Sequence, residues 1–453
     1  MKVLVTRHEH SYGFSLSKEG YRTKPLRITG LSLLLYLILS ISVSQNVVHG
    51  QHLPVNRSDT LEITLREADS LFLQNNLYLL ASSMNIEAQK AQIIQARTYP
   101  NPILIVDVNA YDPEAERAFH VGRTGQKALQ LEQLIILGGK RKAEIELAKT
   151  NARIAELEFQ QLLRQLKFRL RSDLFTIGQQ ALLLDKYNTQ LRQLGELIAA
   201  YEEQAANGHA PLKDVVRLKG AYLKLNNDRA EILEEFFNTQ TSLQTLLRTT
   251  AIIKFQFSEN EVEKYIQERQ LSEIQAEAWQ HRPEYLILGQ NRILAQQYLA
   301  YQRRVAIPDI SLFAAYDQRS GAFEDQISVG LSIPLPLGNR NQGNIKTSHF
   351  KAQEIEYAIE AMRMEITSGI QSAFALYTQI VSEYQKVRTL YNEDFETTVK
   401  GMVENFQKRN VSIIEFIDFF EAYNEVLTEM TRIKTQLVIS AERLNLLTGK
   451  DIF

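Results

Sequence analysis

The stretch Leu137-Gly138-Gly139-Lys140-Arg141 follows an alternating, strand-like segment and opens a long run without proline, which ends only at Pro211. A second stretch, Leu337-Gly338-Asn339-Arg340, stands in the same setting about 200 residues later. Proline interrupts helices, so a proline-free run of this length permits a very long helix. Self-similarity at so long a period indicates one duplicated half-protein rather than a solenoid of short repeats.

Composition excludes several functional classes. The 453 residues include 51 basic and 53 acidic side chains, so bulk charge does not suggest a nucleic-acid partner. Cysteine is absent, which excludes disulfides, thiolate metal sites and thiol nucleophiles. The eight histidines are scattered without ligand spacing. We therefore expect no enzyme, no catalytic residues, no bound metal and no cofactor.

The N-terminus predicts a signal peptide over residues 1–50. Basic residues precede an apolar run from Leu31 to Val43, and small residues allow cleavage near Ser44 or Gly50. An uncleaved N-terminal anchor is the alternative. No second apolar run reaches the length of a membrane-spanning helix, so a mature chain that enters a membrane must do so with strands.

Four segments alternate in hydrophobicity with a period of two. In the clearest one, Ile327, Val329, Leu331 and Ile333 alternate with small or polar residues. A half-buried strand of a soluble sheet would look the same locally, but four such strands in an exported chain fit the lipid-out, water-in pattern of a membrane barrel. Four strands cannot enclose a lumen, so several copies must share one barrel. The predicted strands are 103–111, 127–136, 309–317 and 325–334.

Each strand pair leads into apolar steps of three and four residues, which are typical of a helix packed along its whole length in coiled-coil fashion. At about 1.5 Å per residue, such a helix spans on the order of 100 Å. A shorter helix then returns, and the helix before the strands, from about 64 to 97 in the first half, should fill the remaining length of the rod. The first predicted repeat covers 51–250, with a long helix at 140–206 and a return helix at 212–247. An inter-repeat segment follows at 251–272. The second predicted repeat covers 273–453, with a helix before its strands, a long helix at 343–408 and a return helix at 413–447.

These features together resemble the outer-membrane efflux (TolC-like) family over essentially the whole chain after the leader. Local matches are Pro100-Asn101-Pro102, the Leu137–Arg141 stretch, and Pro334-Leu335-Pro336-Leu337 running into Arg340-Asn341-Gln342-Gly343. They look most like the heavy-metal cation efflux (CzcC-like) branch. The resemblance implies a mainly α chain with a membrane β-barrel: a homotrimer whose four strands per protomer form a 12-stranded barrel, continued by a helical periplasmic barrel.

The function implied by the resemblance is that of an outer-membrane channel, set in outer-membrane lipid and extending into the periplasm. It would be the passive conduit of a tripartite efflux system, with a periplasmic adaptor (membrane fusion) protein and an inner-membrane pump of the resistance-nodulation-division type. Heavy-metal cations are one cargo, and drugs or secreted protein are alternatives that the sequence leaves open. A soluble periplasmic coiled-coil adaptor or scaffold is the rival from another class.

Acidic residues after the rod-to-return turns are the candidate aperture. The resemblance places the periplasmic closure of the channel at Glu415 and Asp418, with Asp214 at the matching position of the first half. Three copies would form a ring of carboxylates that attracts cations. A solvated first helical turn, where acids suit the helix dipole, is the alternative.

The turns themselves are the candidate adaptor contacts. They comprise Gly208 and His209 in the first half, and Arg409, Asn410, Val411 and Ser412 in the second. Arg409 stands where a glycine is usual in the family, so the two halves should meet an adaptor differently. The glycines Gly138, Gly139, Gly338 and Gly343 are predicted to mark the junctions where strands leaving the membrane become periplasmic helices.

Overall fold

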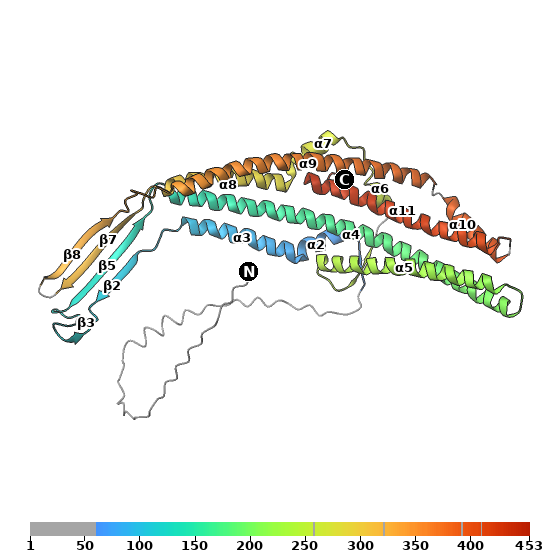
Figure 1. Ribbon diagram of the computed structural model, residues 1–453, viewed down its shortest axis with the longest axis horizontal. Coiled ribbons are helices and arrows are strands. Elements are labelled where there is room, and N and C mark those ends of the chain that lie inside the picture. Colours follow the sequence, from blue (N-terminus) through green and yellow to red (C-terminus); the bar gives the residue numbers. More distant parts are fainter. Residues whose placement is uncertain (1–59, 257–258, 320–321, 391–392, 409) are drawn as a thin grey trace, which may run out of the picture. The chain divides into compact units, whose positions relative to one another are not determined.

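The computed structural model describes residues 60–256, 259–319, 322–390, 393–408 and 410–453, all within one compact unit. The predicted signal peptide with its cleavage sites, and Arg409, lie outside the described residues. Within the described ranges, no helix combines the length and the apolar character needed to cross a membrane. The four-stranded sheet lies at one end of this unit and the rod-to-return turns lie at the other (Figure 1).

Four strands form one antiparallel sheet in the order β2-β5-β7-β8. Its strands are β2 (Ile103–Val108), β5 (Gln126–Ile135), β7 (Ile310–Arg319) and β8 (Phe323–Ser332). They fall within two to three residues of the predicted ranges at each end. A small hairpin of β3 (Tyr111–Asp112) and β4 (Arg117–Ala118) stands between β2 and β5, and the sequence pattern did not predict it.

The sheet has one apolar and one polar face, because residues paired across neighbouring strands share a face. Two apolar rows cross all four strands: Leu104, Leu131, Ala314, Val329, and Val106, Leu129, Tyr316, Ile327. Two rows on the other face carry the polar side chains: Asp107, Ala128, Asp317, Gln326, and Ile105, Gln130, Ala315, Ser328. The apolar face has no covering layer within the described chain, since Ile327 and Val329 are 78% and 81% exposed.

The long helix of the first repeat is α4 (Lys140–Ala206), over the predicted range, and α5 (Leu212–Leu247) returns beside its far half (Figure 1). The predicted single helix of residues 64–97 is wrong: α2 (Leu65–Asn75) and α3 (Leu77–Arg97) meet at Asn76. The buried Asn76 amide caps α3 by accepting from the Leu79 N–H at 3.1 Å and donates to the Leu246 carbonyl at 2.9 Å. This capping ends one helix and starts the next, and it joins the α3 side of the rod to the end of α5.

The second repeat has the same plan. Its helices are α7 (Leu271–His281), α8 (Pro283–Val305), α9 (Gln342–Leu390), α10 (Glu393–Gln407) and α11 (Ile413–Thr448). The break between α7 and α8 at Arg282 repeats the Asn76 break, with ψ angles of 115° and 117° respectively. Proline follows directly at Pro283, where the missing N–H of a first helical residue costs nothing.

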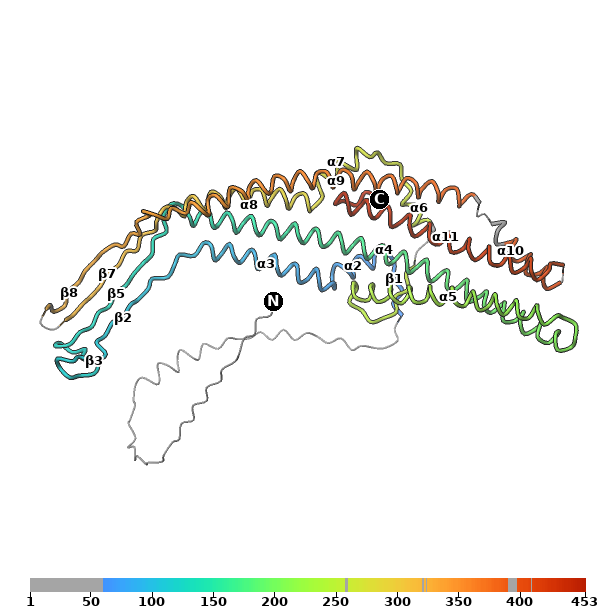
Figure 2. The backbone as a smooth tube through the Cα atoms, in the orientation of Figure 1, coloured from blue at the N-terminus to red at the C-terminus, as the bar shows by residue number. Residues whose placement is uncertain are grey.

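The predicted long helix over 343–408 corresponds to α9 and α10, and residues 391–392 between them lie outside the described residues. The ring of Phe406 in α10 stacks on Phe416 of α11 at a centroid distance of 4.2 Å and on Tyr201 of α4 at 5.7 Å. These ring contacts pack α10 against α4 and α11. Figure 2 shows α10 beside α11 on the way to the second turn.

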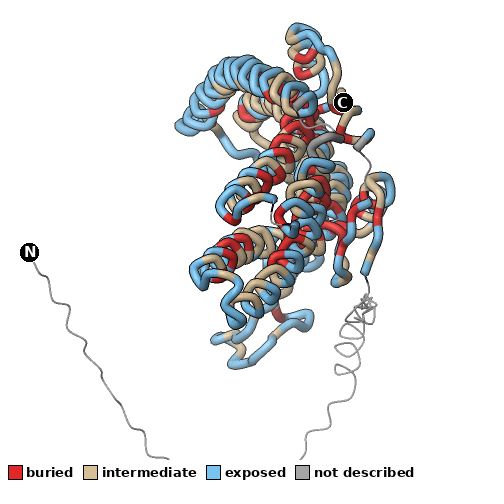
Figure 3. The backbone as a smooth tube through the Cα atoms, turned by 90° about the vertical axis from the view of Figure 1, so that its right-hand side faces the viewer, coloured by how far each residue is buried: buried red, intermediate tan, exposed pale blue. Residues whose placement is uncertain are grey.

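The segment between the repeats contributes one strand to another small, two-stranded sheet. Strand β1 (Thr60–Ile63) pairs in parallel with β6 (Ile252–Phe255), and the short α6 (Glu259–Glu263) follows. In the end-on view of Figure 3, buried residues lie mainly between the helices and exposed residues lie mainly on the outside. The larger buried cluster includes Leu170, Leu174, Leu437 and Leu444 together with this small sheet, and a second cluster fills the region before the turns.

Candidate functional site

The two rod-to-return turns lie at the same end of the described unit, opposite the sheet (Figure 1). The first joins α4 to α5 and the second joins α10 to α11. The structure therefore brings together the two sets of residues that the sequence singled out as adaptor contacts, although they are separated by about 200 positions in the chain.

The first turn is built around a left-handed glycine. Gly208 has a φ of 74°, and the N–H of His209 donates to the Gln204 carbonyl at 2.8 Å. Together these close the end of α4, as glycine does at many helix ends. His209 and Pro211 follow, and Pro211 precedes α5 without a side-chain cap.

The second turn is closed by side chains. Ser412 and Glu415 form a reciprocal capping box: the Ser412 N–H donates to Glu415 Oε2 at 2.9 Å, and the Glu415 N–H donates to Ser412 Oγ at 3.3 Å. The N–H of Asn410 donates to the Asn405 carbonyl at 2.9 Å. The two turns thus differ in chemistry, and Val411 lies half-buried in the second.

Aromatic packing holds the two hairpins together just before their turns. Tyr201 of the first hairpin stacks on Phe406 of the second with an interplanar angle of 1°. Phe416 and Phe420 continue the series on α11. The sequence pattern identified these residues only as apolar helix positions, because periodicity does not reveal which helix each one meets.

The three candidate aperture acids occupy different environments. Glu415 is fully exposed, and its capping interactions with the Ser412 N–H and hydroxyl hold the pKa of its carboxyl below the usual range. Asp418 is exposed, with no hydrogen bond or ion pair of its carboxylate found among the described residues. Asp214 is half-buried in the first turn of α5, and its Oδ1 is buried without a hydrogen-bond partner in that part of the chain. Glu415 therefore has a structural role in its own helix, whereas Asp418 is free to meet solvent ions.

The first strand-to-helix junction contains Gly138 and Gly139, both with a φ of 70°, between the end of β5 and the start of α4. Asp309, just before β7, holds this junction: its Oδ1 accepts from the Leu137 N–H at 2.8 Å and its Oδ2 lies 2.9 Å from Lys140 Nζ. The role of Asp309 was not predicted. Its position after Pro308 at the start of a strand was visible in the sequence, but its contacts with Leu137 and Lys140 of the first repeat were not.

The second junction has a different construction. Gly338 lies in the segment between β8 and α9, but the left-handed residue there is Asn341, with a φ of 61°. The Asn341 amide donates to the Gln302 carbonyl at 2.7 Å, which joins this junction to α8. Gly343 lies inside the first turn of α9. Asparagine tolerates the left-handed conformation and so replaces the second glycine of the first junction.

Comparisons with known proteins identify similar chains. No protein-family model matches. The cobalt-zinc-cadmium resistance protein CzcC of Cupriavidus metallidurans is 23% identical over 342 residues, which cover 75% of this chain and 78% of the relative. Among solved structures, the outer-membrane channel CmeC of Campylobacter jejuni superposes with a TM-score of 0.70 at 13% identity, covering 86% of each chain. CusC, from a study of transmembrane channel formation, superposes with a TM-score of 0.67 at 17% identity, covering 85% of this chain and 92% of its own.

The chain has the fold of these outer-membrane channels, which confirms the predicted fold class of a mainly α chain with four strands, and its similarity to CzcC, CusC and CmeC agrees with the resemblance to the TolC-like efflux family. The relatives are named as a resistance protein and as channels, in agreement with the prediction of an outer-membrane channel rather than an enzyme.

Proposed function

We propose that this chain is one subunit of a trimeric outer-membrane channel that serves as the passive conduit of a tripartite efflux system. The observation that carries this proposal is the four-stranded sheet, which is apolar on one face, polar on the other and open at both edges. A closed barrel removes open edges and places apolar side chains toward lipid and polar ones toward water. Three copies would supply twelve strands.

The helices next to the open edges support the same assembly. Strand β2 follows α3 and strand β8 precedes α9, so an inter-copy contact between the two edges lays α9 of one copy beside α3 of the next. Both helices carry large apolar side chains that are exposed in the single chain: Leu73 and Leu77 around the α2–α3 break, Leu80, Met84 and Ile94 on α3, and Phe350, Tyr357 and Met364 on α9. Their spacing of three, four, seven or ten residues fits the packing of one helix on another.

The partners follow from this arrangement as further parts of the proposal. A periplasmic adaptor would contact the turns at Gly208, His209 and Asn410–Ser412, and an inner-membrane pump of the resistance-nodulation-division type would energise export. Outer-membrane lipid would cover the apolar face of the sheet. The different chemistry of the two turns supports two distinct adaptor contacts per subunit.

At the turn end, Glu415, Asp418 and Asp214 are proposed to form the aperture ring of carboxylates. We expect Asp418 to contribute most to cation attraction, because the Glu415 carboxylate accepts from Ser412, whereas that of Asp418 has no hydrogen bond or ion pair among the described residues. Replacing Glu415 and Asp418 with alanine should raise the concentration of a multivalent cation needed to block single-channel current about tenfold or more. The measurement is conductance of the purified protein in planar bilayers.

The matched control is the Asp185→Ala/Glu234→Ala variant, which removes two exposed acids per chain away from the turns and should leave the block unchanged. Equal block in the wild-type protein and the Glu415/Asp418 variant would contradict the aperture assignment. The channel proposal itself would survive that result as long as current is recorded.

Heavy-metal cations are the proposed cargo, supported by the similarity to a cobalt-zinc-cadmium resistance protein. Deletion of the gene in its own host should lower the tolerated concentration of cobalt, zinc or cadmium, and the intact gene should restore it. Unchanged metal tolerance with increased sensitivity to drugs, or with a loss of secreted protein, would assign the same conduit to another cargo. A protein recovered in the periplasmic fraction would instead favour the soluble adaptor or scaffold.

A further inference from the structure

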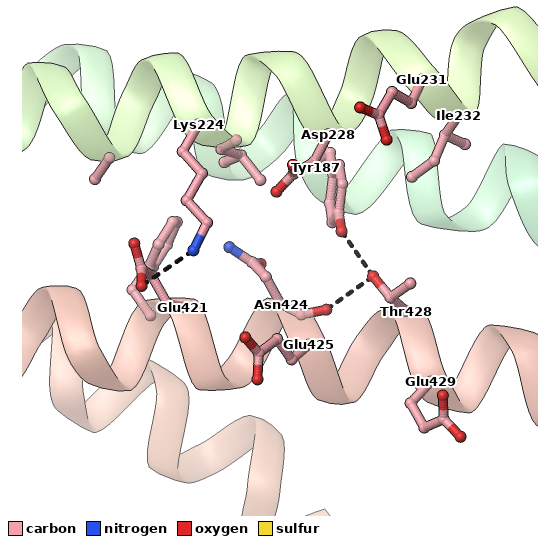
Figure 4. Close-up of a pocket in the computed structure, with 13 residues that line it drawn as sticks. Tyr187, Lys224, Asp228, Glu231, Ile232, Glu421, Asn424, Glu425, Thr428 and Glu429 are labelled. Carbon is pink, nitrogen blue, oxygen red and sulfur yellow. Dashed lines mark hydrogen bonds and ion pairs between the residues drawn. The ribbon is translucent and has the colours of Figure 1, made fainter.

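A crevice of about 380 Å³ lies between the two return helices, α5 and α11, over Tyr187 of α4 (Figure 4). All of its walls come from a single chain, and it is distinct from the turns and from the strand-to-helix junctions. The residues that matter for its chemistry are an acidic set, Asp228, Glu231, Glu421, Glu425 and Glu429, and an apolar set, Tyr187, Leu225, Ile232 and Phe420.

Negative charge in the crevice exceeds positive charge. Among its lining residues the only cation is Lys224, whose Nζ is 3.1 Å from Glu421 Oε2. Arg432, on the next turn of α11, binds Glu429 with its Nε at 2.8 Å. Asp228 has no ion pair within the described residues.

The electrostatics of Asp228 reflect this imbalance. Burial raises the pKa of its carboxyl, and the nearby carboxylates of Glu231 and Glu421 raise it further, while Lys224 acts in the opposite direction. A second cation close to Asp228 would stabilise the ionised form of its carboxyl.

Asn424 supplies an independent indication of a ligand. Its side chain extends from α11 into the space between the two helices (Figure 4). The residue is only 9% exposed, and its Oδ1 is buried without a hydrogen-bond partner in the part of the chain that the structure describes. A buried amide oxygen without a partner costs free energy, which a bound hydrogen-bond donor would recover.

The size and the walls of the crevice favour an organic ligand. Its volume exceeds that of a bare ion, and no group of three or more acidic or histidine side chains among the described residues is arranged to hold a metal ion. The Tyr187 hydroxyl is hydrogen-bonded to Thr428 Oγ1 at 2.8 Å, so the tyrosine contributes its ring to the wall. Aromatic rings beside carboxylates attract flat cations by stacking, cation–π and charge interactions.

We propose that the crevice between α5 and α11 is a binding site for an aromatic organic cation that carries a hydrogen-bond donor, with Asp228 as its counter-ion and the Asn424 amide as its hydrogen-bond partner. The site goes beyond the proposed conduit function and depends neither on trimer formation nor on metal cargo.

Titration of the detergent-solubilised full chain with ethidium, an aromatic cation with amino groups, tests this proposal. Ethidium fluorescence should rise with one saturable site per chain, and Asp228→Asn should weaken binding by about tenfold or more, as loss of a charge partner in a partly buried site does. Asn424→Leu should weaken binding as well. The control Glu234→Gln, which removes an exposed acid of α5 outside the crevice, should change the affinity less than about twofold.

A second readout locates the site. Because the chain contains no cysteine, Ile232→Cys introduces a single thiol in the crevice wall, and bound ethidium should slow its modification by a maleimide. Uncharged phenanthridine should give no protection. Equal ethidium affinity in the wild-type, Asp228→Asn and Glu234→Gln proteins, or unprotected modification at saturating ethidium, would overturn the proposal. Circular dichroism shows whether each variant folds. If a substituted protein does not fold, protection of the Ile232→Cys thiol by ethidium decides whether the crevice is the binding site.

Discussion

Arg171→Met is expected to lower the free energy of unfolding by about 3–5 kcal/mol, which is the usual cost of leaving a buried charge without its partner. Arg171 Nη1 lies 2.9 Å from Glu442 Oε1, and Nη2 lies 3.0 Å from Asp69 Oδ2. The Glu442 side chain is only 3% exposed. The Tyr265 hydroxyl and the Asn445 amide also donate to it, but neither brings a positive charge.

Electrostatics in this cluster keep the Arg171 guanidinium charged. Burial alone would lower the pKa of the Arg171 guanidinium, but the carboxylates of Glu442 and Asp69 outweigh burial and raise it. Burial and the Glu442 carboxylate both raise the pKa of Tyr265, which therefore remains a neutral donor. The pair joins α4 of the first repeat to α11 of the second in the middle of the helical body, so its loss should weaken the union of the two halves.

Denaturant-induced unfolding in detergent, followed by circular dichroism, measures the effect. The control is Arg153→Met on the same helix, where the side chain is 57% exposed and its ion pair with Glu156 should contribute no more than about 1 kcal/mol. The double variant Arg171→Met/Glu442→Leu should recover much of the loss, because the 3% exposed Glu442 carboxylate is then absent, and Asp69, which also loses Arg171, is 25% exposed. Equal stability of the Arg171→Met and Arg153→Met proteins would refute the assigned role.

The second large effect is expected on the apolar face of the sheet. Ile327→Arg/Val329→Arg places two charges per chain where we propose lipid, at about 2–4 kcal/mol for each arginine near the bilayer midplane. Both native side chains are highly exposed and paired with apolar neighbours on β7. The outer-membrane fraction should therefore no longer contain a heat-resistant oligomer of this variant.

The alternation of strand β8 provides a matched control. Gln326→Arg/Ser328→Arg adds the same charge to the same strand, but on the polar face. This variant should still assemble in the membrane. If the two double variants assembled equally well, or if the polar-face variant alone failed, the assignment of lipid and water faces would be wrong.

The sequence predicted the repeated plan well because its main signals are local. Periods of two and of three to four residues located the four strands, and the helices α4 and α5 have the predicted bounds. The glycines of the first junction and Gly208 have the left-handed backbone that only their residue type adopts freely. These features need no information about distant contacts.

Features that depend on tertiary partners were missed. The break at Asn76 rests on the Leu246 carbonyl, 170 positions away, and the pairing of β1 with β6 joins the two ends of the first repeat. The stacking of Phe406 of α10 on Tyr201 and Phe416 was not predicted either, because hydrophobic period does not reveal which helix an apolar side chain meets. The matching break in the second repeat was not predicted either, although Pro283 was a local signal for it, because proline acts on its own backbone.

The candidate site was predicted only in outline. Sequence similarity between the halves placed the two turns, but it gave no indication that Glu415 caps its own helix through Ser412 while Asp418 is exposed. The crevice around Asp228 and Asn424 was also not predicted, since its walls come from three helices that periodicity treats separately.

The number of chains in the membrane-extracted particle tests the central claim most directly. Native mass spectrometry of the protein from purified outer membranes should give a particle of three copies, because three four-stranded sheets close one barrel. A monomer or dimer extracted in folded form, with its sheet edges still open, would contradict the proposed channel.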